Sequence, residues 1–271
     1  MSAKHGTAIR KSLSEKPTLK KRTKAKSVTL LAILREEKKS KLTGGIYHRL
    51  QVDMAYNSNH MEGSRLTHEQ TCYIYEIKTI AFSGEAVRLD DVQETVNHFR
   101  CVDAVLDHGK RPLSEAYILR LHRILKQNTS DAEKDWFAVG AYKKSPNEVG
   151  GRATTKPEEV NHAMKVLLQA YNQAKRKMLE EILDFHARFE RIHPFQDGNG
   201  RVGRLILLSE CLRNDIVPFI ITDGLKFYYY RGLAQWEKEG GYLLDTCLKA
   251  QDDFKEVLKY FRIGYDSTLS E

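Results

Sequence analysis

Residues His193 to Arg204 read HPFQDGNGRVGR and lead into the apolar run LILLSECL. A glycine-rich turn that opens a helix directs free backbone N–H groups and the positive end of the helix dipole at one point, which suits a phosphate. Arg201 and Arg204 are three residues apart, so they share a helix face and add two guanidinium groups at that point. The segment therefore predicts an anion-binding loop.

Two other residues of this segment bring chemistry to the loop. Asp197 precedes the turn and is a hard oxygen ligand, placed to hold Mg²⁺ against bound phosphates. His193 lies four residues earlier and titrates near neutral pH, so it can accept a proton from a hydroxyl. Phe195 is expected to anchor the loop in the core. Each residue alone is commonly structural, but together they favour a catalytic site.

Three generic motifs do not account for the segment. Its glycines match the G-x-G-x-x-G pattern of dinucleotide-binding folds, yet the preceding EEILDFHARFERIHPF has helical spacing where that motif needs a buried strand. The phosphate-binding pattern G-x-x-x-x-G-K-[ST] is absent from the sequence. An EF-hand that starts at Asp197 would have Val202 in place of its glycine and Leu208 in place of its closing acid.

Helical periodicity extends over most of the remaining sequence. From Ile46 onward, apolar residues recur at three- and four-residue spacing. Helices are predicted over 46–62, 67–82, 90–108, 114–128, 157–180, 181–192 and an amphipathic 201–213. Thr67 and Pro157 are signals for helix starts. The stretch 139–153 contains a Ser-Pro-Asn turn and a Gly-Gly pair, which predicts a hairpin or an extended loop. The expected fold class is all-α with one small β-hairpin.

Basic charge is concentrated near the N-terminus. The 271 residues carry 44 Lys and Arg against 36 Asp and Glu, a formal net charge of +8. Residues 1–44 hold 13 basic and 3 acidic residues (+10), and residues 45–271 hold the other 31 and 33 (−2). The sequence thus predicts a flexible basic arm with a short helix over 28–40, and a near-neutral body that does not resemble a nucleic-acid-binding surface. With 41% hydrophobic residues the body can bury a core, which excludes general disorder.

Cysteine and apolar patterns bear on the compartment. The four cysteines lie at least 29 residues apart without a C-x-x-C pair, which is typical of free thiols in a reducing compartment and not of disulfides or a zinc site. No apolar run approaches the ~18 residues of a membrane span. The run VTLLAIL at 28–34 continues into REEKKSKL without a cleavage site, so we expect a cytoplasmic protein.

A second element, AYNSNHMEGS, lies upstream at 55–64. Ser58 and Glu62 are four residues apart, on one face of a helix that Gly63 is expected to end. Glu62 would then lie at a helix C-terminus, where a negative charge is unfavourable unless a cation meets it. The residues alone allow either an exposed glutamate beside a capping glycine or one half of an ion pair.

The segment HPFQDGNGRVGR matches every defined position of the H-x-F-x-[DE]-G-N-[GK]-R-x-x-R signature, and the sequence resembles Fic-domain proteins over roughly residues 46–240. The resemblance implies the all-helical Fic fold and transfer of a nucleoside monophosphate, usually AMP from ATP, to a Ser, Thr or Tyr hydroxyl of a target protein, and of the enzyme itself. It implies that His193 is the base and Asp197 the Mg²⁺ ligand. It further implies phosphate contacts from Gly198, Asn199, Gly200, Arg201 and Arg204.

Three more segments resemble parts of that family. Ser58 to Gly63 is similar to the [ST]-x-x-x-E-[GN] inhibitory motif, which implies a pair between Glu62 and Arg204 that blocks the γ-phosphate and keeps basal activity low. The stretch 139–153 is similar to the Fic flap, and KFYYYRGLAQW at 226–236 to a segment that borders adenine. The implied nucleotide contacts are Asn147, Glu148, Val149 and Gly150 in the flap, and Tyr229 and Tyr230 in the second segment. Glu94, Asn97 and His98 resemble a family helix pattern to which no role is assigned.

We expect three regions: the arm over 1–44, N-terminal helices with the inhibitory motif over 45–90, and the catalytic core with C-terminal helices over 91–271. One alternative is the same fold with another nucleotide, or with removal of AMP. A second is a nucleic-acid-binding regulator that uses the arm and keeps a vestigial site, although the intact motif argues against it. We do not expect a membrane or nucleic acid as partner, and a homo-oligomer is left open.

Overall fold

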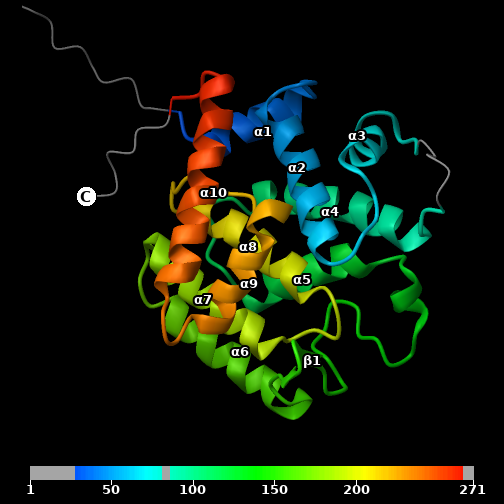
Figure 1. The fold of residues 1–271 in the computed structure, drawn as a ribbon, viewed down its shortest axis with the longest axis vertical. Helices are drawn as coiled ribbons and strands as arrows, with labels where there is room; N and C mark the ends of the chain where they lie inside the picture. The colour runs from blue at the N-terminus through cyan, green and yellow to red at the C-terminus, as the bar shows by residue number, and fades with distance from the viewer. Residues whose placement is uncertain (1–27, 81–85, 265–271) are drawn as a thin grey trace, which may run out of the picture.

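The computed structural model describes residues 28–80 and 86–264. This part of the chain contains ten α-helices, two short 3₁₀-helices and one two-stranded antiparallel sheet, so the predicted all-α class with a small hairpin is confirmed (Figure 1). The helices are α1 (Leu30–Ser40), α2 (Ile46–Met61), α3 (His68–Ile77), α4 (Leu89–His108), α5 (Glu115–Lys126), α6 (Pro157–Tyr171), α7 (Leu179–Ile192), α8 (Asn199–Arg213), α9 (Lys226–Gln235) and α10 (Gly241–Tyr260). The strands are β1 (Glu148–Val149) and β2 (Arg152–Ala153), and the 3₁₀-helices are η1 (Ser130–Glu133) and η2 (Asp223–Leu225).

Both predicted helix starts are present. Thr67 is the N-cap of α3, where its hydroxyl accepts from the Gln70 N–H and the Gln70 side chain accepts from the Thr67 N–H, a complete capping box. Pro157 occupies the first turn of α6, where its missing N–H costs no hydrogen bond.

Two predicted helix ends are wrong. The helix expected over 157–180 ends at Tyr171, because the polar stretch that follows has no apolar face to bury and is held by hydrogen bonds from Asn172 to the Leu113 carbonyl and from the Lys177 N–H to Asn214. The helix expected over 67–82 ends at Ile77, where the next residue adopts a left-handed conformation. The hairpin predicted within 139–153 is present over its last six residues, where Glu148 pairs with Ala153.

Helix α8 is the central element of the bundle. Figure 1 shows it in the middle of the molecule, and thirteen of its fifteen residues are buried. The helix predicted over 201–213 is present, but its predicted amphipathic character is wrong: the run LILLSECL has no solvent face, because helices surround it on several sides. Its N-terminus carries the motif of interest, so the best-packed helix of the fold positions the site.

The first helix belongs to the same body. Leu30, Leu31 and Leu34 of α1 lie in one core cluster with residues of α2, α4 and α8. The short helix predicted over 28–40 is therefore present as α1 and packs in the core, and residues 1–27 of the predicted arm lie outside the described part.

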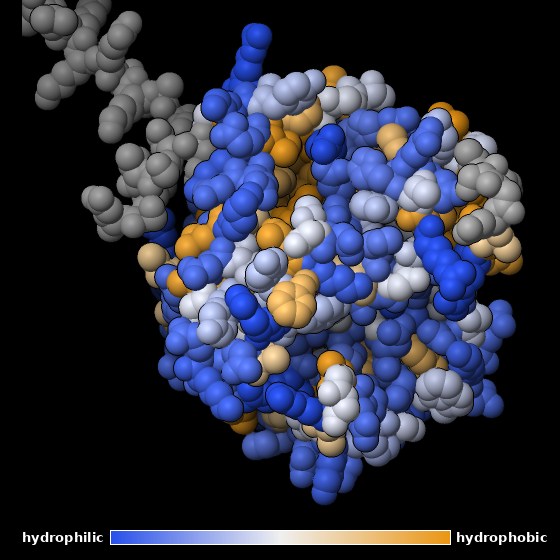
Figure 2. All heavy atoms as spheres, in the orientation of Figure 1, coloured by the Kyte–Doolittle hydropathy of each residue, from blue (hydrophilic) through white to orange (hydrophobic). Residues whose placement is uncertain are grey.

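The surface in view is largely hydrophilic. Figure 2 shows polar side chains over most of this face, with apolar ones gathered in a band beside α10. Among the described residues, none of the helices combines the length and apolar character that crossing a bilayer requires. The cysteines of this part are free thiols, as predicted.

Candidate active site

The loop between α7 and α8 is closed by its own side chains. His193 ends α7 in a left-handed conformation (φ 51°), with its N–H donating to the Phe189 carbonyl. Phe195 is fully buried and stacks on the His122 ring at 3.9 Å between centroids, so its predicted anchoring role is confirmed. The two contacts fix the loop ahead of the glycines.

Asn199 and Gly198 turn the chain into α8. The Asn199 Oδ1 accepts from the Phe195 N–H at 2.8 Å, and its Nδ2 donates to the Phe195 carbonyl at 2.8 Å. Gly198 is the N-cap with φ +83°, a conformation that a residue with a Cβ rarely adopts. The Asn199 side chain is buried and used in the loop, so its backbone N–H is the group that remains for an anion, and the predicted phosphate contact of Asn199 stays a prediction.

His193 has the protonation state of a base. Its Nδ1 lies 3.3 Å from the Glu190 carbonyl oxygen, an acceptor only, so Nδ1 carries the proton and Nε2 keeps its lone pair. Burial lowers the pKa of His193 below its ordinary value, assisted by the neighbouring charge of Lys143 and opposed by the Glu190 hydrogen bond. The neutral ring is therefore the dominant form at pH 7.

Asp197 lies among cations. Its Oδ2 accepts from Lys126 Nζ at 2.7 Å and from Arg201 Nη2 at 2.9 Å. Burial alone would raise the pKa of Asp197, but Arg201 and Lys126 outweigh it and hold the carboxyl well below its usual range. Asp197 is thus ionised, and 45% of its side chain is exposed. Glu94 of α4 also bridges the two cations, through Oε1 to Lys126 and Oε2 to Arg201.

Arg204 is bound by the upstream element. Its Nη2 donates to Glu62 Oε1 at 2.7 Å and to the Ser58 carbonyl at 2.9 Å, and its Nε donates to Ser58 Oγ at 2.9 Å. Gly63 follows the end of α2 with φ +94°, as expected of a residue that ends the helix. Burial opposes the ionised form of Glu62, but Arg204 overcomes it and lowers the pKa of that carboxyl. Of the two possibilities that the sequence leaves for Glu62, the ion pair is the one present.

The Glu62 carboxylate lies against the start of α8. A Cβ placed on Gly200 would come within 2.3 Å of Glu62 Oε1, so the glycine makes room for that oxygen. Gly200 belongs to the first turn of α8, where backbone N–H groups and the helix dipole attract an anion. A carboxylate of the chain itself therefore occupies part of the space that the sequence predicts for phosphate.

Asn147, the residue before the hairpin, is hydrogen-bonded to the motif loop. The Asn147 Nδ2 donates to the Phe195 carbonyl, and its Oδ1 accepts from Lys143 Nζ and Thr154 Oγ1. Lys143 is buried, and burial lowers its pKa to about 8. Glu148, Val149 and Gly150 are exposed beyond this anchor, so their predicted nucleotide contacts stay predictions.

The two tyrosines of α9 differ in position. Tyr229 is fully buried, and its hydroxyl lies 2.6 Å from His186 Nε2. The expectation that it borders a nucleotide is wrong in this conformation, because the surrounding apolar core covers it. Tyr230 is 41% exposed and lies near Arg204 and Glu62, so it remains a candidate.

Sequence reasoning missed three groups around this site. Lys126 and Asp131 lie far from the motif in the chain and belong to no recognised pattern. Glu190 is adjacent to the motif and half-buried on α7, and the burial of its carboxyl raises the pKa to about 8. In the sequence, only the helical periodicity of 181–192, which places Glu190 on the inward face, could have indicated this residue.

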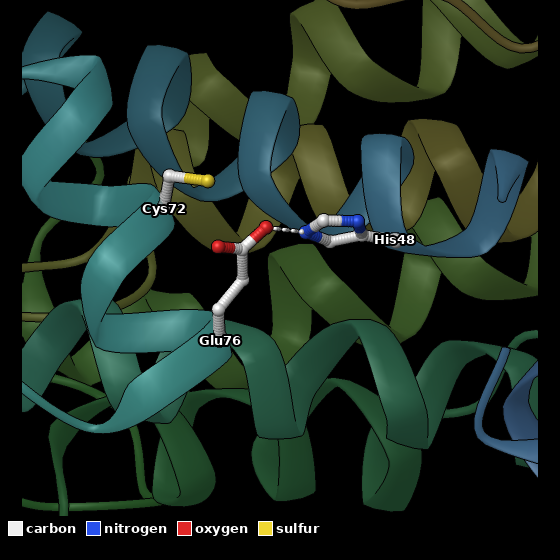
Figure 3. Close-up of side chains that lie close together, drawn as sticks. All are labelled: His48, Cys72 and Glu76. Carbon is white, nitrogen blue, oxygen red and sulfur yellow. Dashed lines mark ion pairs between the residues drawn. The ribbon is translucent and has the colours of Figure 1, made fainter. Parts of the chain in front are cut away.

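A second group of metal-ligating residue types lies elsewhere. His48 of α2 and Cys72 and Glu76 of α3 converge, with His48 Nε2 3.0 Å from Glu76 Oε1 (Figure 3). The Gly44 N–H donates to His48 Nδ1, so in the neutral ring Nε2 carries the proton and faces the carboxylate. Because a metal would need that nitrogen deprotonated, we assign the cluster to the packing of α2 against α3.

Comparison with protein families matches one part of the chain. Residues 112–210 match the model described as the Fic/DOC family. The matched range runs from the start of α5 through the motif loop and most of α8. Ser58 and Glu62 lie outside it.

Curated relatives and solved structures carry related names. The chain is 26% identical over 187 residues to "Protein adenylyltransferase Fic" of Nematostella vectensis, covering 66% of this chain and 42% of that protein. It is 26% identical over 176 residues to a probable protein adenylyltransferase of Aquifex aeolicus, covering 60% and 53%. The chain thus spans about half or less of these relatives' lengths. A Fic domain containing signaling protein from Bacteroides thetaiotaomicron superposes with a TM-score of 0.64 at 27% identity over 85% of this chain and 90% of that one. Fic-1 from C. elegans, at 18% identity and a TM-score of 0.65, covers 86% and 72% and supports the fold alone.

Proposed function

We propose that this protein is a self-inhibited protein adenylyltransferase that moves AMP from ATP to a Ser, Thr or Tyr hydroxyl of a target protein, and of itself. The observation that carries the proposal is the motif loop. It combines a neutral His193, an ionised Asp197 and a helix N-terminus that already attracts a carboxylate. The names of the relatives support the choice of adenylyl transfer.

In the proposed reaction His193 acts as the general base. Nδ1 is held by the Glu190 carbonyl, so Nε2 takes the proton from the target hydroxyl. That oxygen attacks the α-phosphorus of ATP, the bond from the α-phosphorus to the bridging oxygen breaks, and pyrophosphate leaves. The start of α8 orients the phosphates, and Arg204, once it is released from Glu62, pairs with the negative charge. Arg201 Nε is buried without a hydrogen-bond partner among the described residues, which leaves a donor for a ligand.

Asp197 is the residue that would hold Mg²⁺. Its donor fits, because it is an ionised carboxylate with a half-exposed side chain, and hard divalent cations prefer oxygen ligands. When bound, the ion supplies neutralisation of phosphate charge. The chain's own contribution is to keep Asp197 ionised beside Arg201 and to place it at the mouth of the anion site.

Glu62 is proposed as the built-in inhibitor. It uses the guanidinium of Arg204 and lies over Gly200, so the outer phosphates of ATP and this carboxylate compete for the same groups. Low basal activity follows, and it rises when Glu62 is removed or withdrawn.

Labelled nucleotides test this function. Wild type, Glu62→Gly and His193→Ala are each incubated with ATP, GTP, CTP or UTP labelled at the α-phosphate, with Mg²⁺, alone and with lysate. The proposal predicts label on protein from ATP with Glu62→Gly, much less with wild type and none with His193→Ala. Label from UTP instead of ATP would replace adenylylation by uridylylation, and no label from any nucleotide would contradict the proposal.

A further inference from the structure

Lys126 is a buried cation that pairs with Asp197 and with two other carboxylates. It is the last residue of α5, and its side chain is 1% exposed. Its Nζ lies 2.5 Å from Glu94 Oε1, 2.7 Å from Asp131 Oδ2 and 2.7 Å from Asp197 Oδ2. An ammonium has three N–H donors, so three carboxylates from three parts of the chain use all of them.

Helix α4 fixes the backbone around this lysine. Asn97 lies one turn after Glu94, and its Nδ2 donates to the carbonyls of Leu125 and Gln127, the residues on either side of Lys126. The Glu94 and Asn97 pattern thus acquires a physical role: α4 holds both the charged end and the main chain of Lys126. Neutralising the Lys126 ammonium would need only the carboxylate. The added hydrogen bonds to the main chain indicate that α4 fixes the position of Lys126 as well.

The same cluster has the composition of a cation site. Glu94, Asp131 and Asp197 offer carboxylate oxygens within 4.8 Å of one another, which is the kind of donor set that holds Mg²⁺ or Mn²⁺. Lys126 lies among these oxygens, and Arg201 bridges Glu94 and Asp197. Lys126, Arg201 and the more exposed Lys134, which pairs with Asp131, balance the three carboxylates. The part of the cluster that stays open to a further cation is the side chain of Asp197, which is 45% exposed.

We propose that Lys126 is a positioning residue that acts as a built-in cation: it occupies the inner part of this carboxylate cluster and confines a divalent ion to the exposed side of Asp197, next to the anion site. The inference rests on the proposed function, because that position matters only where phosphates bind. Lys126, Glu94 and Asp131, which lie outside the motif, would thus determine where the divalent ion binds.

The test is metal binding by the full chain without nucleotide. Mn²⁺ is titrated into wild type, Lys126→Met and Lys134→Met, and free Mn²⁺ is followed by its EPR signal. Lys134 is the matched control, because it pairs with Asp131 at 2.6 Å but is 42% exposed and does not reach the cluster's centre. Even at the dielectric of water, loss of a unit charge about 4 Å from a divalent ion changes its affinity more than tenfold. Lys126→Met should therefore bind Mn²⁺ at least about tenfold more tightly than both other proteins.

A folded Lys126→Met protein with wild-type Mn²⁺ affinity would overturn the inference. If near-UV circular dichroism shows that Lys126→Met does not fold, the inference is tested with Asp131→Asn, into which Mn²⁺ is titrated in the presence of ATP. It removes one carboxylate that restrains Lys126 and leaves Asp197 intact, so Mn²⁺ should bind several-fold more weakly than to wild type. Equal or tighter binding would contradict the proposal. Absence of AMP transfer by every variant, Glu62→Gly included, would refute the proposed function and still leave the Mn²⁺ titrations to decide the role of Lys126.

Discussion

Replacing Glu62 by glycine should destabilise the free protein and strengthen ATP binding by the same free energy. The Arg204 side chain is 5% exposed and that of Glu62 26%, with 2.7 Å between Nη2 and Oε1. Breaking a fully buried ion pair costs about 3–5 kcal/mol, but Glu62 is partly exposed and Ser58 keeps two hydrogen bonds to Arg204, so we expect about 2 kcal/mol. For a chain of this size that lowers Tm by about 4–8 °C.

In the proposed mechanism the same ion pair opposes nucleotide binding in the wild type. If ATP displaces the carboxylate from Arg204 as proposed, the ~2 kcal/mol of the pair is subtracted from the binding free energy of ATP, a factor of roughly 30 in Kd. Calorimetric titration of ATP and Mg²⁺ into wild type, Glu62→Gly and Glu62→Gln measures this factor, with the glutamine variant expected between the other two because it keeps the shape and loses the charge. If Glu62→Gly has wild-type Tm and wild-type ATP affinity, the reasoning about this ion pair is refuted.

Three further outcomes follow from the site. Burial lowers the pKa of His193, and the proposed base is the neutral ring. In a plot of kcat/KM against pH for Glu62→Gly, the acid limb should therefore have its midpoint below pH 6.5. A midpoint above pH 7 would contradict the assignment of the base. The pKa of Glu190 is raised from 4.5 to about 8 in the folded state, so between these pH values the folded protein keeps a proton that the unfolded chain has released. The stability contributed by this proton is lost as the pH rises from 4.5 through 8. Glu190→Gln should therefore have a higher Tm than wild type at pH 9 and not at pH 4. Asn199→Ala removes two buried hydrogen bonds to Phe195 and should cost about 2 kcal/mol in denaturant unfolding, whereas an unchanged midpoint would show that the loop closes without them.

Local patterns predict the local parts of this structure. The capping signals at Thr67 and Pro157 need only a few neighbouring residues, and both are realised. The motif loop is equally local, since the glycine turn, Phe195 and the start of α8 lie within a dozen residues. The pair between Glu62 and Arg204 spans 142 residues and was expected only through the family resemblance.

Tertiary packing decides what the patterns leave out. Nothing in the run LILLSECL distinguishes a half-exposed helix from the fully surrounded α8, because the residues that cover it are contributed by other helices. Lys126 and Asp131 reach Asp197 only because α5 ends beside the motif loop. Tyr229 and Tyr230 are adjacent in sequence, yet the first is buried and the second exposed, since successive residues on a helix point in different directions.

We propose that this loop transfers AMP and that Glu62 holds it inactive. The most direct measurement is the intact mass of purified wild type, Glu62→Gly and the double variant Glu62→Gly with His193→Ala after incubation with ATP and Mg²⁺, with and without lysate proteins as targets. The account predicts that Glu62→Gly adds the mass of an adenylyl group to itself or to a target, that wild type does so far more slowly, and that the double variant does not. Equal modification by Glu62→Gly and the double variant, or none by Glu62→Gly on any protein, would contradict it.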